Sequence, residues 1–308
     1  MTFLDHSAFD PIFWLHHANV DRLIAIWQAL NPNSFNINQK NNAGTYSIAA
    51  GTVETASTTL PPFHIKADGS RFTSNTARYT KTFGYTYPEI QDWGKTAAQL
   101  TKDVKAKIRS LYDPNGALGR RRRNTEPSQL PDGETPPLDV AQVIQNGVYR
   151  QWQINIRANK FELDSSYTIY TFFGEPCADS RNWATSENFA GSFPVLRTQG
   201  NPSGAPMTVY GVLPITRKLI DVIDTDKTHN LLPQTVEPYL QKKLTWRVAT
   251  VTGEPVDLKK LPSLKIYVVD QVVTPPQTST DFPIYGEVTP YRNITEGKLG
   301  GLLKSDSY

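Results

Sequence analysis

Two adjacent histidines lie near the start of the chain, in a segment that also holds aromatic and acidic side chains. The segment reads DPIFWLHHANVD and runs from Asp10 to Asp21. A metal-bound imidazole needs a second group that fixes its tautomer, usually a carboxylate or a carbonyl. Asp10 and Asp21 are candidates for that supporting role, and Phe13 and Trp14 would form a dry wall. The same residues also suit a simpler arrangement, in which Asp10 caps a helix and the aromatic rings are core.

The segment has the pattern of an α-helix. Asp10 is a favourable N-cap residue, and Pro11 suits the first helical position. Residues at helical spacing then share one face: Phe13, His17, Val20, Ile24 and Trp27. His17 and Asp21 are four residues apart and are therefore neighbours on the helix surface. His16 points about 100° away from His17, because each residue of an α-helix turns by that angle.

A change in periodicity divides the rest of the chain. Residues 95–112 have the apolar spacing of a second amphipathic helix. Residues 113–137 combine turn formers, prolines and four consecutive arginines, a composition that cannot bury enough apolar surface to order itself. Period-two alternation follows, in residues 151–157, 167–173, 208–215, 244–251 and 265–273. Short strands of this kind predict an antiparallel sandwich or barrel, so we expect a helical domain over 1–112, a linker over 113–137 and a β-rich domain over 138–308.

Composition excludes several classes of function. The chain has 308 residues, of which 38% are hydrophobic, so it is long enough for a real core and for two domains. A net charge of +3 is too small to argue for a nucleic-acid partner, and no apolar run is long enough to span a bilayer. Cys177 is the single cysteine, so no internal disulfide can form, and the first residues do not resemble a signal peptide. These features favour a cytoplasmic protein; they leave open whether it forms a homo-oligomer.

The opening segment resembles the second copper-binding signature of the type 3 copper proteins, which include tyrosinases, catechol oxidases and haemocyanins. The residues that match this signature are Asp10, Pro11, Phe13, Trp14, His17 and Asp21. His17, and not His16, takes the position of the copper ligand. The sequence FGYTYPE resembles the tyrosine motif that closes the catalytic core of these enzymes, with Tyr85 and Tyr87 as its pair. The β-rich part, with YTIYTFFGEP at 167–176, looks like the C-terminal domain of fungal tyrosinases.

The resemblance implies chemistry on phenols with molecular oxygen. Tyrosinases hydroxylate monophenols and oxidise o-diphenols to o-quinones, which leads to melanin-type pigments, whereas catechol oxidases largely carry out the second step. Both use two coppers, each held by three histidines, in a four-helix bundle. The implied fold is therefore a part of this helical copper core followed by an antiparallel β-sandwich or barrel-like domain. The implied partners are a phenolic substrate and dioxygen.

The number of histidines falls short of the family pattern. A dicopper site needs six histidines, but this sequence has five: His6, His16, His17, His64 and His229. Only His17 lies in a matching motif. We therefore expect the chain to be the C-terminal portion of a larger tyrosinase and to be inactive by itself. The alternatives are a portion of a catechol oxidase and a non-enzymatic regulatory β-domain that shields a copper site.

Other residues carry weaker expectations from the same resemblance. Leu4 lies near the position that gates substrate access to the second copper, although it also suits a core role. Cys177 and Ser180 match the positions of a Cys-x-x-Cys pair that helps to deliver copper in some fungal tyrosinases, but a single thiol is a poor copper(I) site. Trp183 and Phe189 lie in a polar stretch and are candidates for the bulky residue that the covering domain inserts over the coppers. Either of them could instead pack back on the sandwich.

The four arginines Arg120, Arg121, Arg122 and Arg123 are a candidate processing site between the two domains. Fungal tyrosinases resemble zymogens, in which a cut in the linker frees the copper core from its C-terminal cover. A solvated basic run without such a role is the simpler alternative.

The linker composition generates a prediction that needs only the sequence. In brief limited digestion, trypsin should cut first between Arg120 and Asn124, ahead of the other lysines and arginines, because an unstructured segment fits the protease most readily. Mass spectrometry of the first fragments measures the order of cleavage. First cuts within residues 146–275 would show that the domain boundary is misplaced.

Overall fold

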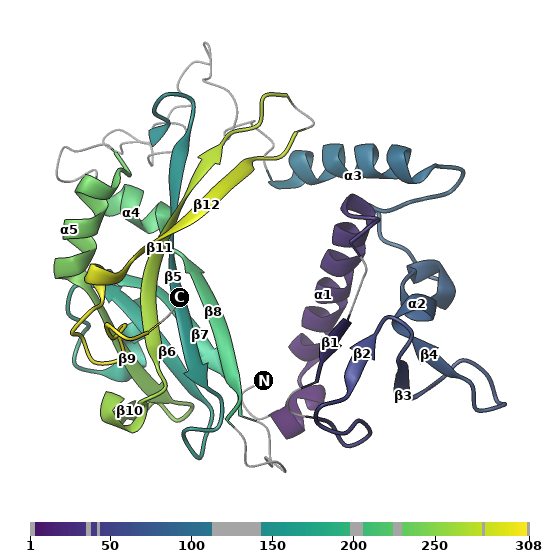
Figure 1. Ribbon diagram of the computed structural model, residues 1–308, viewed down its shortest axis with the longest axis horizontal. Coiled ribbons are helices and arrows are strands. Elements are labelled where there is room, and N and C mark those ends of the chain that lie inside the picture. Colours follow the sequence, from purple (N-terminus) through teal and green to yellow (C-terminus); the bar gives the residue numbers. More distant parts are fainter. Residues whose placement is uncertain are drawn as a thin grey trace. The chain divides into compact units, whose positions relative to one another are not determined.

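The computed structural model describes residues 4–34, 38–41, 44–112, 143–197, 206–223, 230–278 and 281–306. The chain divides into two compact units. The first consists essentially of His6–Pro114 and is called the helical unit; the second consists essentially of Asn115–Tyr308 and is called the β unit. The predicted combination of helices followed by antiparallel sheets is confirmed (Figure 1). The predicted linker at 113–137 lies outside the described residues.

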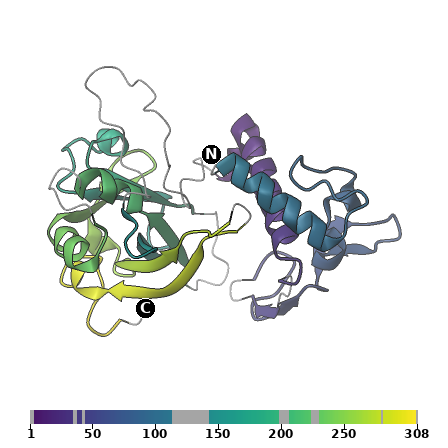
Figure 2. The same ribbon diagram turned by 90° about the horizontal axis from the view of Figure 1, so that it is seen from above.

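Two helices form the frame of the helical unit. A short 3-10 helix, η1 (Leu4–Phe9), leads into α1 (Pro11–Leu30), and α3 (Ala97–Tyr112) lies across α1 (Figure 2). Between them are the two-stranded sheets β1–β2 and β3–β4 and two short helices. Their bounds are β1 Asn38–Lys40, β2 Val53–Thr55, β3 Thr59–His64, β4 Arg71–Thr73, α2 Ser74–Ala77 and η2 Thr80–Phe83.

Local signals in the sequence explain where α1 begins and what it buries. The Asp10 side chain accepts a hydrogen bond of 3.0 Å from the backbone N–H of Ile12, as predicted for an N-cap residue. The buried stripe of α1 comprises Ala25, Ile26, Ala29 and Leu30, which pack with residues of α3 that include Val104. This stripe is not the face that the apolar spacing marks. Val20, Ile24 and Trp27 remain exposed, because α3 packs on the other side of α1.

Two four-stranded antiparallel sheets form the β unit. One has the strand order β10–β9–β6–β7, and the other β12–β11–β5–β8. Their bounds are β5 Tyr149–Asn159, β6 Tyr167–Phe173, β7 Phe189–Val195, β8 Thr208–Pro214, β9 Leu244–Thr250, β10 Pro255–Val256, β11 Lys265–Thr274 and β12 Ile284–Tyr291. The helices are η4 Ser180–Thr185, α4 Thr216–Ile223, α5 Pro233–Lys243, η6 Leu258–Lys260 and η7 Arg292–Ile294. Each sheet keeps two edge strands, so the described residues form a sandwich and not a closed barrel.

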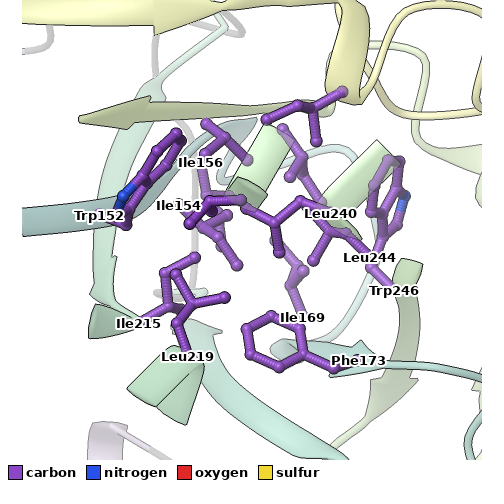
Figure 3. Packing of buried hydrophobic residues seen from close by; sticks show 14 of the residues in the cluster. Trp152, Ile154, Ile156, Ile169, Phe173, Ile215, Leu219, Leu240, Leu244 and Trp246 are labelled. Carbon is purple, nitrogen blue, oxygen red and sulfur yellow. The ribbon is translucent and has the colours of Figure 1, made fainter. Parts of the chain in front are cut away.

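The core of the β unit lies between the sheets and under α4 and α5 (Figure 3). Alternate residues of β5, among them Trp152, Ile154 and Ile156, point into it and are fully buried, as the period-two pattern predicts. The indole N–H of Trp152 donates to the carbonyl of Leu231 at 2.9 Å, and that of Trp246 donates to the carbonyl of Leu299 at 2.9 Å. The core thus buries two large rings without leaving their polar groups unpaired.

Leu240 on α5 offers a test of this core, because its side chain is fully buried against the sheets. Leu240→Ala should lower the free energy of unfolding by about 2–5 kcal/mol, the usual cost of a cavity in a close-packed core. Leu299→Ala is the matched control; its side chain is 53% exposed, so the change should stay within about 0.5 kcal/mol. Urea unfolding followed by tryptophan fluorescence measures both values. Equal changes in the free energy of unfolding for the two variants would mean that Leu240 on α5 does not pack into the core.

Candidate copper-ligand site on the first helix

His17 lies in the second turn of α1 and is oriented by its own helix. Its Nδ1 is 2.9 Å from the carbonyl oxygen of Phe13, one turn earlier. A carbonyl oxygen only accepts, so Nδ1 carries the proton and Nε2 carries the lone pair. The rings of Phe13 and His17 are in contact, with a centroid distance of 4.0 Å and an angle of 37° between their planes. His17 is exposed, so its Nε2 is available as a metal ligand.

His16 has a different environment, although it is the next residue. The two histidine rings are nearly perpendicular, at 89°, with their centroids 5.5 Å apart. The helix therefore directs the two imidazoles along different lines, as predicted from its pitch.

Asp21 binds two tyrosine hydroxyls and not the histidine ring. The hydroxyls of Tyr85 and Tyr87 each donate to Oδ2 of Asp21 at 2.6 Å, and that of Tyr87 also lies 3.2 Å from the carbonyl of Ala18. The group that fixes the His17 tautomer is thus the Phe13 carbonyl, whereas Asp10 caps the helix. We predicted the carboxylates as candidates for the tautomer role, but the structure gives it to the backbone, whose C=O lies closer to the ring along the helix.

Burial raises the pKa of both tyrosines, and the hydrogen bond to Asp21 raises it further, to about 12 for Tyr87. The physical reason is that a phenolate beside the Asp21 carboxylate would place two negative charges on one hydrogen bond. The two hydroxyls therefore remain donors throughout the neutral range.

Arg22 and Glu89 add an ion pair to the same contact. The guanidinium of Arg22 donates to the two carboxylate oxygens of Glu89 at 2.7 and 3.3 Å, and Glu89 is 9% exposed. The hydrogen bond from Arg22 lowers the pKa of Glu89. Consecutive residues of α1, Asp21 and Arg22, thus hold three side chains of the segment 85–89. Arg22 directly follows the segment DPIFWLHHANVD, and Glu89 is the last residue of FGYTYPE, but the sequence alone did not indicate that they pair.

One long face of α1 is apolar and exposed. It carries Val20, Leu23, Ile24 and Trp27, whose exposed fractions are 37%, 45%, 52% and 47%. Contiguous apolar surface of this kind is rare on a soluble domain and marks a contact surface. His17 borders this face, since it is three and seven residues from Val20 and Ile24.

The sequence left two alternatives for Trp183 and Phe189 of the β unit: insertion over a copper site or packing on the sandwich. Trp183, in η4, is only 4% exposed and packs with Phe172 and Tyr170. Its indole N–H donates to the carbonyl of Cys177 at 2.9 Å. Phe189 begins β7 and is half-buried in the same cluster. The inward packing of Trp183 agrees with the second of these alternatives, and the polar residues around it form a capped 3-10 helix.

The other sequence candidates are not gathered around His17 by the described residues. Cys177 is exposed, and its Sγ lies 3.3 Å from the carbonyl of Asp179, while the Ser180 hydroxyl donates to the carbonyl of Gly253 at 2.5 Å. Leu4 begins η1, but its side chain lies outside the described part of the chain, as do Arg120–Arg123 and His229. Within the described part, no group of three or more His, Cys, Asp or Glu side chains is arranged to hold a metal ion. No described helix is long and apolar enough to cross a membrane.

Comparison with known proteins identifies this pair of units. The model of the common central domain of tyrosinase matches residues 1–30, and that of the tyrosinase C-terminal domain matches residues 151–268. A Neurospora crassa tyrosinase is 28% identical to this chain in an alignment that spans 392 residues. The alignment covers 98% of this chain and 57% of that protein. The chain belongs to the tyrosinase family. The predicted resemblance is therefore confirmed.

Two further tyrosinases support this membership. A tyrosinase of Podospora anserina is 31% identical over 277 residues, which cover 75% of this chain and 48% of that protein. A crystal structure of latent and active mushroom tyrosinase is similar with a TM-score of 0.70 and 25% identity, covering 95% of this chain and 51% of that chain. This chain thus spans about half the length of the relatives it matches. The tyrosinase family consists of type 3 copper oxidoreductases.

The raised tyrosine pKa values predict how the helical unit responds to alkali. A phenol whose folded pKa exceeds its unfolded value of about 10 contributes stability that is complete below pH 10 and is lost as the pH rises toward 12. Unfolding by urea, followed by circular dichroism at pH 8 and pH 11, should therefore show a smaller alkaline loss in the double variant Tyr85→Phe, Tyr87→Phe than in the unmodified chain. At pH 8 the double variant should be less stable by about 1–3 kcal/mol.

Tyr46→Phe is the control for this measurement, since Tyr46 is fully exposed. It should match the unmodified chain at both pH values. An alkaline loss in the double variant as large as that of the unmodified chain would show that the two hydroxyls do not carry the effect.

Proposed function

We propose that this chain contributes one copper ligand, His17, to a tyrosinase-type oxidase that converts monophenols and o-diphenols to o-quinones. The observation that carries the proposal is the hydrogen bond between His17 Nδ1 and the Phe13 carbonyl, which leaves the Nε2 lone pair exposed on an ordered helix. Neutral imidazole is a ligand that suits copper. Copper would supply the reaction with dioxygen, and the phenol would be the reducing substrate.

The residues around His17 have positioning roles in this proposal. Phe13 holds the imidazole plane through its carbonyl and its ring. Asp21, with Tyr85 and Tyr87, ties the next turn of α1 to the segment 85–89. The exposed apolar face beside His17 is where the remaining helices of a family-type copper core would pack. We assign the metal itself only to His17, because the described residues include no cluster of three potential ligands.

The β unit carries a second part of the proposal, a shielding role. It matches the C-terminal domain of tyrosinases and has a fully buried core of its own. Under this proposal, residues 138–308 cover the copper site, and cleavage at Arg120–Arg123 releases it. The alternative is that this chain by itself is a regulatory β-domain without enzyme activity. Copper content separates the two proposals: the full-length oxidase would bind two coppers, whereas a regulatory chain by itself would bind none stoichiometrically.

Oxidase activity should be absent from this chain alone. With added copper, L-DOPA and oxygen, the rate of quinone formation should not exceed that of the same concentration of free copper, because one imidazole cannot hold two metal ions. Quinone absorbance follows the reaction. Turnover well above the free-copper rate would contradict the expectation that this chain holds only one of the copper ligands.

The assignment of His17 is tested in a longer protein that combines this chain with the remaining copper-binding helices of the family. His17→Ala should lose one copper of two and essentially all activity, whereas His16→Ala should retain both metals. Metal content by atomic absorption, with quinone formation alongside, measures the difference. His16→Ala is the matched control, since it removes the same ring one position away. Equal copper loss in the two variants would show that the wrong ring has been assigned.

A further inference from the structure

The helical unit contains a cavity that the copper chemistry does not use. Its volume is about 160 Å³, and it lies between the last turns of α1, the first turn of α3 and residues 78–81. Ala25, the residue of α1 in its wall nearest to His17 in sequence, is eight residues away, which corresponds to about 12 Å along the helix. The cavity therefore belongs to a separate part of the unit.

The wall of the cavity is divided into an apolar and a charged part. Ala25, Ala29, Ile90 and Leu100 supply methyl and methylene groups and belong to or border the small core between α1 and α3. An enclosed apolar cavity of about 150 Å³ holds one benzene ring in another protein. The volume of this cavity is therefore sufficient for a single ring.

Two cationic side chains line the other side of the cavity. The guanidinium of Arg78 lies 5.2 Å and Nζ of Lys81 lies 5.5 Å from the centre of the Tyr79 ring, and all three residues line the cavity. An Nη2–H of Arg78 donates to the carbonyl of Pro32 at 2.6 Å, which fixes the direction of the guanidinium. One carboxylate, Asp92, also lines the wall. The side chains of Arg78 and Lys81 both carry N–H groups that can donate to an anion in the cavity.

We propose that this cavity binds a small organic carboxylate with one six-membered ring. The ring packs on the methyl groups of Ala25 and Ala29, and the carboxylate accepts from Arg78 and Lys81. Inorganic phosphate would leave the apolar wall uncovered. The site requires neither copper nor His17, so this proposal can be tested independently of the proposed oxidase function.

The test uses the complete chain without copper and an NMR titration with benzoate at low salt. Benzoate should shift the amide signals of residues that line the cavity, with a dissociation constant in the millimolar range, roughly as expected for so small a ligand. Benzamide has the same shape without the charge and should bind about fivefold or more weakly. Raising the salt concentration should weaken benzoate and leave benzamide unchanged.

Variants separate this site from binding elsewhere. Lys81→Gln should reduce the affinity for benzoate about fivefold and leave that for benzamide unaltered, while Lys66→Gln, an exposed lysine of the β3–β4 hairpin, should change neither. Ala97→Phe, at the exposed start of α3, should block the cavity and abolish both shifts. Equal affinity for benzoate and benzamide, no effect of Lys81→Gln, or shifts confined to other residues would each overturn the proposal. The comparison of the two lysine variants decides the question even if Ala97→Phe fails to fold.

Discussion

Asp21 is the residue on which the candidate site depends. One carboxylate oxygen accepts from two tyrosine hydroxyls, each at 2.6 Å, and these tyrosines come from a segment more than sixty residues further along the chain. Arg22 repeats the contact with Glu89. Helix α1 is exposed on most of its surface, and most of the stability of a helix in a protein comes from packing against other parts of the chain rather than from its own propensity. The contacts to residues 85–89, together with α3, therefore keep α1 ordered and with it the direction of His17.

The helix has two apolar sides with different partners. On one side, the small residues Ala25 and Ala29 pack in the cluster that includes the fully buried Val104 of α3. The larger residues Val20, Ile24 and Trp27 lie on the opposite side and remain exposed. The candidate ligand His17 borders the exposed face, against which further helices of a bundle would pack. This arrangement agrees with membership of a family whose copper core is a helical bundle, and with a chain that spans about half the length of its relatives.

The β unit is stabilised independently of these contacts. Its core is continuous between the two sheets and under α4 and α5, and the buried indoles of Trp152 and Trp246 are hydrogen-bonded. Trp183 strengthens one outer side of the sandwich by packing on Phe172. A unit with its own core can fold without the contacts that hold α1, and the proposed shielding role requires this property.

The sequence alone determined the family, the position of α1 and the identity of the ligand candidate. These follow from local signals: an N-cap, a helical repeat and a complete copper-binding signature within twelve residues. It also located β5, β6, β8, β9 and β11 by their alternation. It missed β7 and β12, since each contains a glycine and a proline that interrupt the pattern. Only the tertiary structure decided which face of α1 is buried, that Asp21 binds tyrosines while a carbonyl fixes His17, and that Trp183 packs inward. The reason is that each of these depends on a partner far away in the sequence or on the direction of a side chain, and neither is encoded in local spacing.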